Sequence, residues 1–327
     1  MSTRFALSPE AALARMLPGA SFRDKQRDAL EHTWQGRSSL VLMPTGMGKS
    51  LLYQLPIFAS NGIGVVISPL VALMQQQSTK LSAMGAFVLS LGGKDAAEAQ
   101  KELRAFPWKC GPAFLFLSPE RAETDGYLER LLRRHREQVS LLAVDEAHCI
   151  SQWGHDFRPP YKAIPTFLDR VFGYGQWPTL LCLTATLDAQ SQAEIVSDFR
   201  LKHDDTVMSN QMLRTNLDLS FRTYENGEAK LSALDGLLEQ HRGDKIIVYA
   251  HLKRNKTYGT RALAQRYAAL GHRCAPFDAD LPGTEKDDTL ERFTSGDLDV
   301  VIATGAFGMG IDIPDIRGVV PLCANVA

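Results

Sequence analysis

Short apolar runs alternate along this chain with longer segments of mixed polarity. In the first two thirds, five runs predict buried strands, at Ser39–Leu42, Gly64–Ile67, Phe114–Leu117, Leu141–Val144 and Leu180–Leu183. Helical spacing marks the segments between them, as at Leu70–Met84 and Tyr127–Gln138. Because parallel strands need long crossovers, this alternation predicts an α/β fold whose parallel sheet has helices on both faces.

The pattern becomes irregular after Thr206, and Asn226-Gly227 then gives a turn signal. A second series begins there, with strands predicted at Ile246–Tyr249, Val300–Ala303 and Arg317–Leu322 and a helix at Lys256–Leu270. We place the boundary near Asn210 to Leu213, which divides the chain into residues 1–212 and 213–327. The length of 327 residues also suits two domains of ordinary size.

The first segment, Met1–Leu17, has no unbroken apolar stretch, so it predicts a short amphipathic helix rather than a secretory signal. No run approaches the roughly 20 apolar residues that a membrane helix needs. Five scattered cysteines without Cys-x-x-Cys spacing indicate neither a zinc site nor a disulfide framework. Cys182 lies in an apolar run and is expected to be buried. We therefore expect a cytoplasmic protein without a membrane association.

Charge is balanced, with 36 basic and 37 acidic side chains and a net charge of −1. A protein held to nucleic acid by its overall charge would be strongly basic, so any such contact here must be local. The densest basic run, Arg130–Arg136, is interpreted as a solvated helix face.

The segment Met43–Ser50 follows the first predicted strand directly and leads into a helical pattern that starts at Lys49. Gly46 and Gly48 let the backbone turn several N–H groups toward one phosphate. Lys49 can reach the outer phosphates, and the Ser50 hydroxyl can bind Mg²⁺. The general phosphate-loop pattern begins with glycine, where this chain has Met43. The strand before the loop and the helix after it still favour a phosphate site over a chance turn.

An acidic pair, Asp145-Glu146, ends the apolar strand Leu141–Val144. Ligands of open α/β sheets gather at this carboxyl edge. We expect Asp145 to hold Mg²⁺ through its water shell and Glu146 to orient the attacking water, with His148 beside them.

The segment from Asp145 to Pro159 resembles the RecQ family of superfamily 2 DNA helicases. Its first four residues, Asp-Glu-Ala-His, are shared by many helicases, but the aromatic-rich stretch from Cys149 to Pro159 is typical of that family. The resemblance extends from about Phe22 to about Val320. It implies two RecA-like domains that close on one ATP with Mg²⁺, DNA as the substrate, and 3′→5′ polarity.

The resemblance also assigns roles to residues outside the two central motifs. The adenine-reading element matches Phe22, Arg23 and Gln26, and the phosphate-loop residues are Thr45, Gly46, Met47, Gly48, Lys49 and Ser50. DNA contacts are expected from Ser68, Pro69, Ser118, Trp153, His155, Phe157 and Arg158. Exposed aromatic side chains such as Trp153 and Phe157 can stack on bases, although a buried Trp153 that pins the loop is the alternative. The segment Thr184–Thr186 resembles the motif that links hydrolysis to movement.

The second domain departs from the family in two places. The arginine motif that would face the γ-phosphate is absent before Ala327, so we expect an incomplete second RecA-like domain, either as part of a longer helicase or as a protein that borrows these elements from a partner. The segment Pro276–Leu281 replaces a histidine-alanine-glycine run, and its Asp278 and Asp280 are expected to make that surface repel phosphates.

Three functions therefore remain open from the sequence. The first is a DNA-stimulated ATPase and helicase core. The second is a module that binds ATP and single-stranded DNA but hydrolyses slowly, since the arginine motif is missing. The third is an RNA helicase, because Asp-Glu-Ala-His also occurs there, although the aromatic-rich stretch argues against it.

Overall fold

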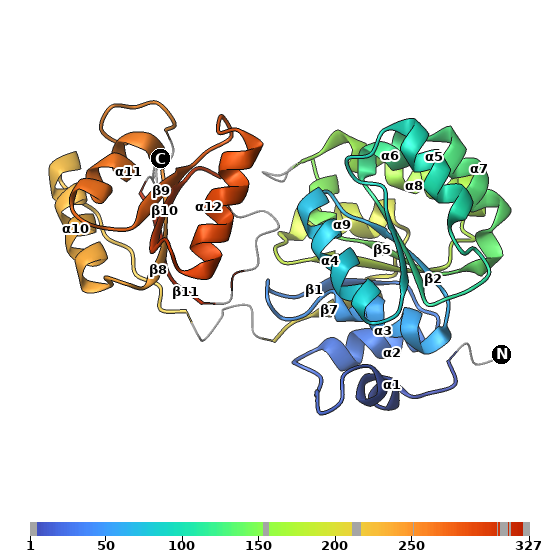
Figure 1. Ribbon diagram of the computed structural model, residues 1–327. Helices are drawn as coiled ribbons and strands as arrows, with labels where there is room; N and C mark the ends of the chain where they lie inside the picture. The colour runs from blue at the N-terminus through green and yellow to red at the C-terminus, as the bar shows by residue number, and fades with distance from the viewer. Residues whose placement is uncertain are drawn as a thin grey trace. The chain divides into compact units, whose positions relative to one another are not determined.

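The computed structural model describes residues 5–152, 157–210, 217–250, 252–305, 307, 313 and 315–322. The chain divides into two compact units, residues 1–217 and 218–327. The expected boundary near Asn210 to Leu213 lies mostly outside the described residues. Each unit contains its own sheet and its own apolar cores, so each is described by itself (Figure 1).

The sheet of the first unit has seven strands in the order β3-β4-β2-β5-β6-β1-β7, and all of its paired strands are parallel. The strands are β1 (Ser39–Leu42), β2 (Ile63–Ile67), β3 (Phe87–Ser90), β4 (Ala113–Leu117), β5 (Val139–Val144), β6 (Thr179–Thr184) and β7 (Thr206–Met208). All residues of β1, β2, β4, β5 and β6 are buried, which is why each appears as an apolar run in the sequence. The five predicted strands of this unit are confirmed, whereas β3 and β7 were not predicted.

Helices cover both faces of this sheet (Figure 1). One apolar core joins the sheet to α5 (Ala96–Ala105), α6 (Pro119–Thr124), α7 (Gly126–Arg134), α8 (Pro159–Phe172) and α9 (Ala189–Asp198). The other core joins it to α1 (Pro9–Met16), α2 (Gln26–Trp34), α3 (Leu51–Ser60) and α4 (Val71–Ala83). Short 3₁₀ turns stand at Arg136–Gln138, Ala147–Ile150 and His203–Asp205. Among the described residues, none of the helices is long and apolar enough to cross a membrane.

Capping side chains explain where several of these helices begin. Ser8 accepts a hydrogen bond from the N–H of Ala11 at the start of α1, and Asp188 accepts one from Ser191 at the start of α9. The prediction that a helix starts at Lys49 was wrong by two residues, because Lys49 and Ser50 still form a turn and α3 begins at Leu51.

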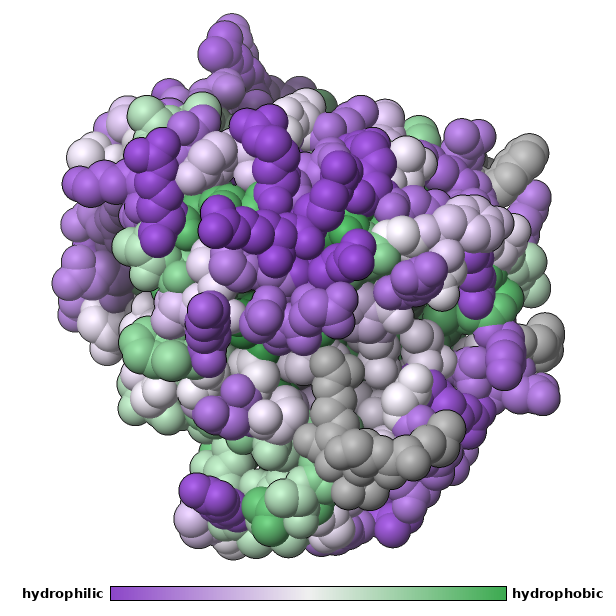
Figure 2. All heavy atoms as spheres, turned by 90° about the vertical axis from the view of Figure 1, so that its right-hand side faces the viewer, coloured by the Kyte–Doolittle hydropathy of each residue, from purple (hydrophilic) through white to green (hydrophobic). Residues whose placement is uncertain are grey.

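Charged residues of α7 and α8 pair with one another on the surface of the first unit. Glu129 accepts hydrogen bonds from Arg133 at 2.7 Å and from Arg170 at 2.8 Å. Arg136 pairs with Glu137 at 3.3 Å. These contacts confirm the interpretation of the basic run as a solvated helix face. The side of the molecule in Figure 2 is covered mainly by hydrophilic side chains in its upper part.

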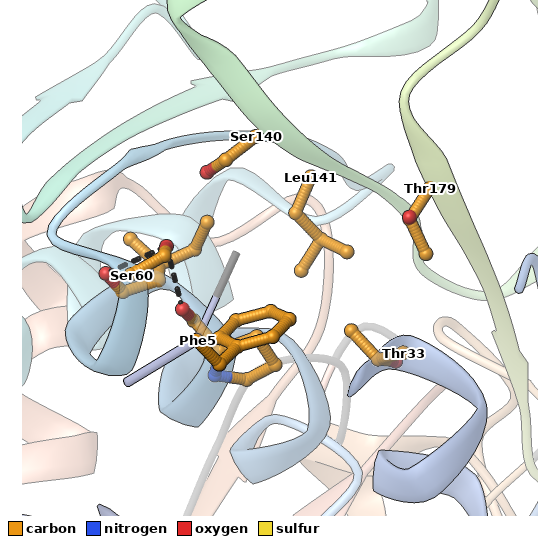
Figure 3. Close-up of a pocket in the computed structure, with 8 residues that line it drawn as sticks. Phe5, Thr33, Ser60, Ser140, Leu141 and Thr179 are labelled. Atoms are coloured by element: carbon orange, nitrogen blue, oxygen red, sulfur yellow. Dashed lines mark hydrogen bonds between the residues drawn. The ribbon is translucent and has the colours of Figure 1, made fainter. Parts of the chain in front are cut away.

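Two aromatic side chains pack near the amino-terminal ends of β5 and β6. Phe5 stacks on Trp34 with ring centroids 4.2 Å apart, and it lies beside the first residues of β5 and β6. The space between Phe5, Thr33, Ser140 and Thr179 is too small to hold a water molecule (Figure 3). This particular gap is therefore too small for a ligand.

The second unit has a four-stranded parallel sheet in the order β11-β8-β10-β9. Its strands are β8 (Lys245–Tyr249), β9 (Cys274–Phe277), β10 (Val300–Ala303) and β11 (Ile316–Pro321), and its helices are α10 (Gly227–Gln240), α11 (Thr260–Ala269) and α12 (Gly283–Ser295). Two apolar cores, one with α10 and α11 and one with α12, lie on its two faces. The three predicted strands are confirmed, and the predicted helix begins four residues later than expected, at Thr260.

Candidate active site

The segment Met43–Ser50 forms a loop at the carboxyl end of β1. Its first residue is buried, and the Met43 N–H donates to the carbonyl of Thr184 at the end of β6. Gly46 and Gly48 have φ values of +83° and +79°, which glycine adopts without strain. A Cβ on Gly48 would lie 2.6 Å from Nε2 of Gln26, so a side chain there would displace the Gln26 amide.

Lys49 turns its side chain back into this loop. Its Nζ donates to the carbonyl of Met43 at 3.0 Å. Burial lowers the pKa of Lys49, while the nearby carboxylates of Glu146 and Asp145 act in the opposite direction. The ammonium group thus lies between the loop and the acidic end of β5. There it would neutralise the negative charge of a bound phosphate.

Gln26, at the start of α2, binds the loop through side-chain hydrogen bonds. Its Nε2 donates to the carbonyls of Met47 at 2.8 Å and Gly48 at 3.2 Å. Its Oε1 accepts from the Arg23 N–H at 2.8 Å, and an Arg23 guanidinium nitrogen lies 3.4 Å from the carbonyl of Gly46. Phe22 packs against the apolar core behind these residues. The structure therefore brings Arg23 and Gln26, two of the three residues expected to read adenine, into contact with the loop.

Asp145 and Glu146 stand where β5 ends, directly beside β6 and β2. Burial and the neighbouring Glu146 raise the pKa of Asp145 to about 6, although Lys49 opposes this shift. Glu146 has φ +51°, a left-handed conformation that costs a non-glycine residue about 1–2 kcal/mol. Strain of this kind persists where surrounding structure enforces it, and here it turns Glu146 out of the strand direction.

His148 connects this acidic turn to β6. Its Nδ1 lies 2.9 Å from Oγ1 of Thr184 and 3.4 Å from Oε2 of Glu146. The Thr184 hydroxyl donates to the carbonyl of Thr186 at 2.8 Å, so it is an acceptor toward His148. This arrangement assigns a proton to Nδ1 of His148. One imidazole N–H thus faces both the Glu146 carboxylate and the Thr184–Thr186 segment.

Residues on both sides of the aromatic-rich stretch are attached to the same edge. The Ser151 hydroxyl accepts from Ser191 of α9 at 2.9 Å, and the Arg158 N–H donates to the carbonyl of Cys149. Tyr161, which is completely buried, donates from its hydroxyl to the carbonyl of Asp145 at 2.8 Å. Sequence reasoning missed Tyr161, because a tyrosine 16 residues beyond Asp145 carries no local signal.

The expected nucleic-acid residues are only partly brought together. Ser68 is buried at the end of β2, and the Ser118 hydroxyl caps α6 by accepting from the Arg121 N–H at 3.3 Å. Pro69 and Arg158 are adjacent, with a guanidinium nitrogen 3.5 Å from the Pro69 carbonyl. Phe157 is half-buried. Trp153 and His155 lie outside the described residues.

Comparison with known proteins agrees with this geometry. The model of the DEAD/DEAH box helicase family matches residues 23–195, and that of the helicase conserved C-terminal domain matches residues 229–325. The chain belongs to the DEAD/DEAH box helicases. Within them, its relatives identify it as a RecQ-family helicase of superfamily 2.

Two such relatives are proteins named ATP-dependent DNA helicase RecQ. The chain is 31% identical to the one from Bacillus subtilis over 313 residues, which cover 94% of this chain and 50% of the relative. It is 31% identical to the one from Haemophilus influenzae over 297 residues, covering 91% and 46%. ATP-dependent helicase wrn-1 of Caenorhabditis elegans is 32% identical, covering 94% and 29%. This RecQ-family chain spans half of the length of these relatives or less.

Solved structures show the same fold. The helicase Lhr of Mycobacterium smegmatis, bound to single-stranded DNA and AMP-PNP, matches 97% of this chain with a TM-score of 0.67 and 20% identity, and the match covers 44% of Lhr. The Hef helicase domain of Pyrococcus furiosus matches 92% of this chain with a TM-score of 0.58 and 14% identity, covering 89% of that domain. The expected fold of two RecA-like sheets is confirmed.

Proposed function

We propose that this chain is the motor core of a RecQ-type DNA helicase that hydrolyses ATP in response to single-stranded DNA. The observation that carries the proposal is the convergence of Gly48, Lys49, Asp145 and Glu146 at one edge of the sheet, with Gln26 fastened over the loop. We further propose that residues 1–217 are the ATP-binding domain and residues 218–327 the helicase C-terminal domain.

The chemistry of the residues fits ATP and Mg²⁺. The positive φ values of Gly46 and Gly48 give the loop a backbone turn that suits a phosphate, and the half-buried Lys49 supplies a positive charge beside it. Burial and the neighbouring Glu146 raise the pKa of Asp145, so a cation held by Asp145 together with the Ser50 hydroxyl would stabilise its carboxylate. Bound ATP with Mg²⁺ would supply the phosphoanhydride bond that is hydrolysed.

The remaining residues position the reactants. Glu146, turned out of the strand by its left-handed backbone, would orient the attacking water as a general base. His148 would sense the state of that carboxylate through the same N–H that bonds to Thr184. Because Thr184 begins the segment Thr184–Thr186 that leads toward α9, hydrolysis at Glu146 would be linked to a movable element.

DNA would run over the same edge of the first unit. We assign backbone contacts to the segments at Ser68-Pro69 and Ser118, and base stacking or phosphate contacts to Trp153, His155, Phe157 and Arg158. Support comes from the attachments of this stretch: Arg158 reaches Pro69, and Tyr161 reaches the carbonyl of Asp145. A base stacked here would thus contact a segment that is joined to Asp145 through the Tyr161 hydroxyl.

The test measures ATP turnover with and without single-stranded DNA, comparing the wild type with Lys49→Ala. We expect DNA to raise turnover and Lys49→Ala to remove it, while Lys101→Ala, which removes an exposed lysine of α5, leaves it unchanged. Turnover that survives Lys49→Ala would refute the proposal. Binding of ATP and DNA without turnover would instead favour the slowly hydrolysing module, and stimulation by RNA alone would favour an RNA helicase.

A further inference from the structure

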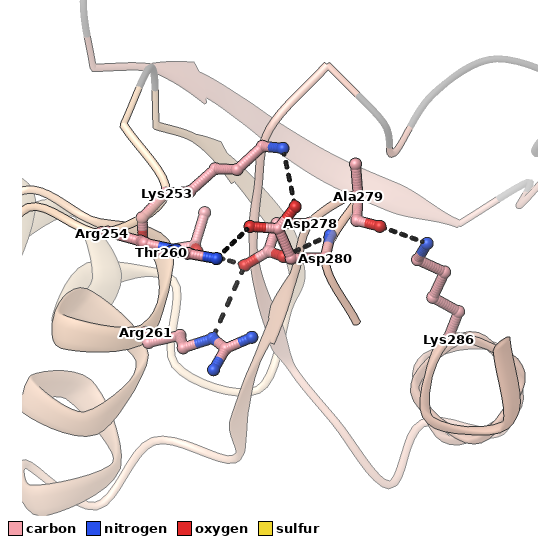
Figure 4. Close-up of polar contacts among 8 residues, drawn as sticks. All are labelled: Lys253, Arg254, Thr260, Arg261, Asp278, Ala279, Asp280 and Lys286. Atoms are coloured by element: carbon pink, nitrogen blue, oxygen red, sulfur yellow. Dashed lines mark hydrogen bonds and ion pairs between the residues drawn. The ribbon is translucent and has the colours of Figure 1, made fainter. Parts of the chain in front are cut away.

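Two aspartates follow β9 in the second unit, and the structure gives them different surroundings (Figure 4). Asp278 is 1% exposed and accepts a hydrogen bond from Oγ1 of Thr260, at the start of α11, at 2.9 Å. Nε of Arg261 lies 3.8 Å from the same carboxylate. The expectation that Asp278 faces solvent and repels phosphates was therefore wrong, because this carboxylate is occupied inside the domain.

Asp278 also fixes the position of its neighbour. Its Oδ1 accepts from the Asp280 N–H at 2.9 Å, and Lys286 of α12 donates to the carbonyl of Ala279 at 3.0 Å (Figure 4). These bonds attach the loop to both α11 and α12. The backbone that carries Asp280 is thus fixed in position.

The Asp280 carboxylate pairs with two cations on the loop after β8. Lys253 Nζ lies 3.1 Å from Oδ1 of Asp280, and a guanidinium nitrogen of Arg254 lies 3.3 Å from Oδ2. Both pairs are exposed, with Arg254 87% accessible to solvent. The hydrogen bond from Lys253 lowers the pKa of Asp280, so the carboxylate is ionised at neutral pH.

The loop that carries these cations has a defined shape. Oδ1 of Asn255 accepts from the N–H groups of Thr257 and Tyr258 at 2.9 and 2.8 Å. A Cβ on Gly259 would come within 2.4 Å of the Asn255 carbonyl, so glycine is required for the chain to pass. Lys253 and Arg254 therefore lie next to a turn of defined backbone geometry, which helps to position them beside Asp280.

The cluster lies at the carboxyl edge of the sheet. Tyr249, Ala303 and Phe277, the last residues of β8, β10 and β9, are in register across the three strands. The loops with Lys253 and Asp280 leave from two of these strand ends. Open α/β sheets bind ligands at this edge, so Lys253 and Arg254 stand where a ligand of the second unit would bind.

We propose that Asp280 is a built-in competitor of nucleic-acid phosphates for Lys253 and Arg254. The proposal rests on the proposed DNA-binding function and concerns the affinity of the second unit for DNA. A carboxylate and a phosphate present the same kind of charged oxygen acceptor to a lysine or an arginine fork. While Asp280 occupies both cations, DNA must displace it before gaining either contact.

The competition is adjustable because exposed ion pairs are weak and are screened by salt. Phosphates can therefore displace Asp280, and the second unit binds DNA more weakly than its cations alone would allow. The functional consequence is a second unit that releases DNA readily. Within the described part of the second unit, Asp278 is committed to the interior and Asp280 is the carboxylate that pairs with the two cations, so this one side chain sets the affinity.

The experiment measures binding of a fluorescein-labelled 20-nucleotide oligothymidine to the full chain by anisotropy, across a series of salt concentrations. Asp280→Asn keeps the shape of the side chain and removes its charge. We expect it to bind about three- to tenfold more tightly at low salt, with a steeper salt dependence because two more cations meet phosphates. Lys253→Ala combined with Arg254→Ala should abolish this gain in the Asp280→Asn background and cost less in the wild-type background.

Asp315→Asn is the matched control. Asp315 is exposed and pairs with Lys245 at 2.9 Å, but it precedes β11 and so stands at the opposite edge of the same sheet. An equal gain in Asp280→Asn and Asp315→Asn would mean that only net charge matters and would overturn the proposal. Unchanged or weaker binding by Asp280→Asn, while the wild type binds, would overturn it as well. If neither the wild type nor any variant binds, the proposed DNA-binding function itself fails.

Discussion

Nδ1 of His148 lies 2.9 Å from Oγ1 of Thr184, and this hydrogen bond joins the turn after β5 to the end of β6. The same nitrogen lies 3.4 Å from the Glu146 carboxylate, and the Thr184 hydroxyl donates a hydrogen bond to the carbonyl of Thr186. A change in the charge or position of Glu146 therefore acts on the His148 imidazole, which also binds the Thr184 hydroxyl. This is the physical basis on which hydrolysis and movement are expected to be linked.

The first prediction separates this link from nucleotide binding. His148→Ala and Thr184→Val each remove one partner of the bond, and each should lower the DNA-stimulated kcat by about tenfold, equivalent to roughly 1.4 kcal/mol. Because both changes remove the same interaction, the double variant should be no slower than either single variant. Steady-state ATP turnover at saturating DNA measures this.

The control for Thr184→Val is Thr33→Val. Thr33 is also buried, and its hydroxyl bonds only within its own helix, to the carbonyl of Ala29 at 3.4 Å. It should leave kcat unchanged. Losses that multiply in the double variant would show that His148 and Thr184 act independently and would contradict the link.

The second prediction concerns the buried charge of Asp145. Its pKa is about 6 in the folded protein against 3.8 for the free side chain, so the folded state holds the proton more tightly. Stability from this group is fully present below pH 4 and is lost as the pH rises through 6. In metal-free buffer, Asp145→Asn should therefore be more stable than the wild type at pH 7.5, by on the order of 2 kcal/mol, and the difference should vanish near pH 4.

Urea unfolding at several pH values with EDTA checks this dependence. Asp169→Asn provides a control of opposite sign, because the hydrogen bonds from Arg200 hold the pKa of Asp169 below its usual range. That variant should be less stable than the wild type at neutral pH and should lose its disadvantage as the pH falls below 4. A pH-independent effect of Asp145→Asn would mean that its carboxyl is not desolvated.

The sequence predicted the interior strands because burial on both faces requires continuous apolar runs, as in Val139–Val144. It missed three strands at the edges of the sheets, although it predicted β11, which is also outermost. β3 exposes Phe87, β7 has only three residues, and β9 includes Pro276, which cannot donate to a ladder and is tolerated at an edge. All three are outermost strands, where partial burial leaves little pattern to detect.

The candidate site divides in the same way. Gly48, Lys49 and Asp145 were predictable because their chemistry depends on neighbours in the sequence. Contacts across the sheet were not, since the hydroxyl of Tyr161 meets the Asp145 carbonyl only through the packing of α8. Burial of Asp278 was missed for the same reason: its partner, Thr260, belongs to another element.

The third prediction tests why glycine occupies position 48. Gly48→Ala introduces both a left-handed alanine and a contact of 2.6 Å with Nε2 of Gln26. Gly36 has a similar φ of +73° but open space around its Cα, so Gly36→Ala introduces the backbone strain alone, about 1–2 kcal/mol. Gly48→Ala should therefore cost about 1–3 kcal/mol more than Gly36→Ala in urea unfolding of the first unit.

Removing the opposing side chain should reveal the clash. Gln26→Ala opens the space next to Gly48, so in that background Gly48→Ala and Gly36→Ala should cost similar amounts. ATP affinity gives an independent readout, because only the change at 48 distorts the loop between Met43 and Ser50, and we expect at least a tenfold loss there and none at 36. If Gly48→Ala remained as costly without Gln26, the strain would come from the backbone alone, and the fastening of the loop by α2 would not explain this glycine.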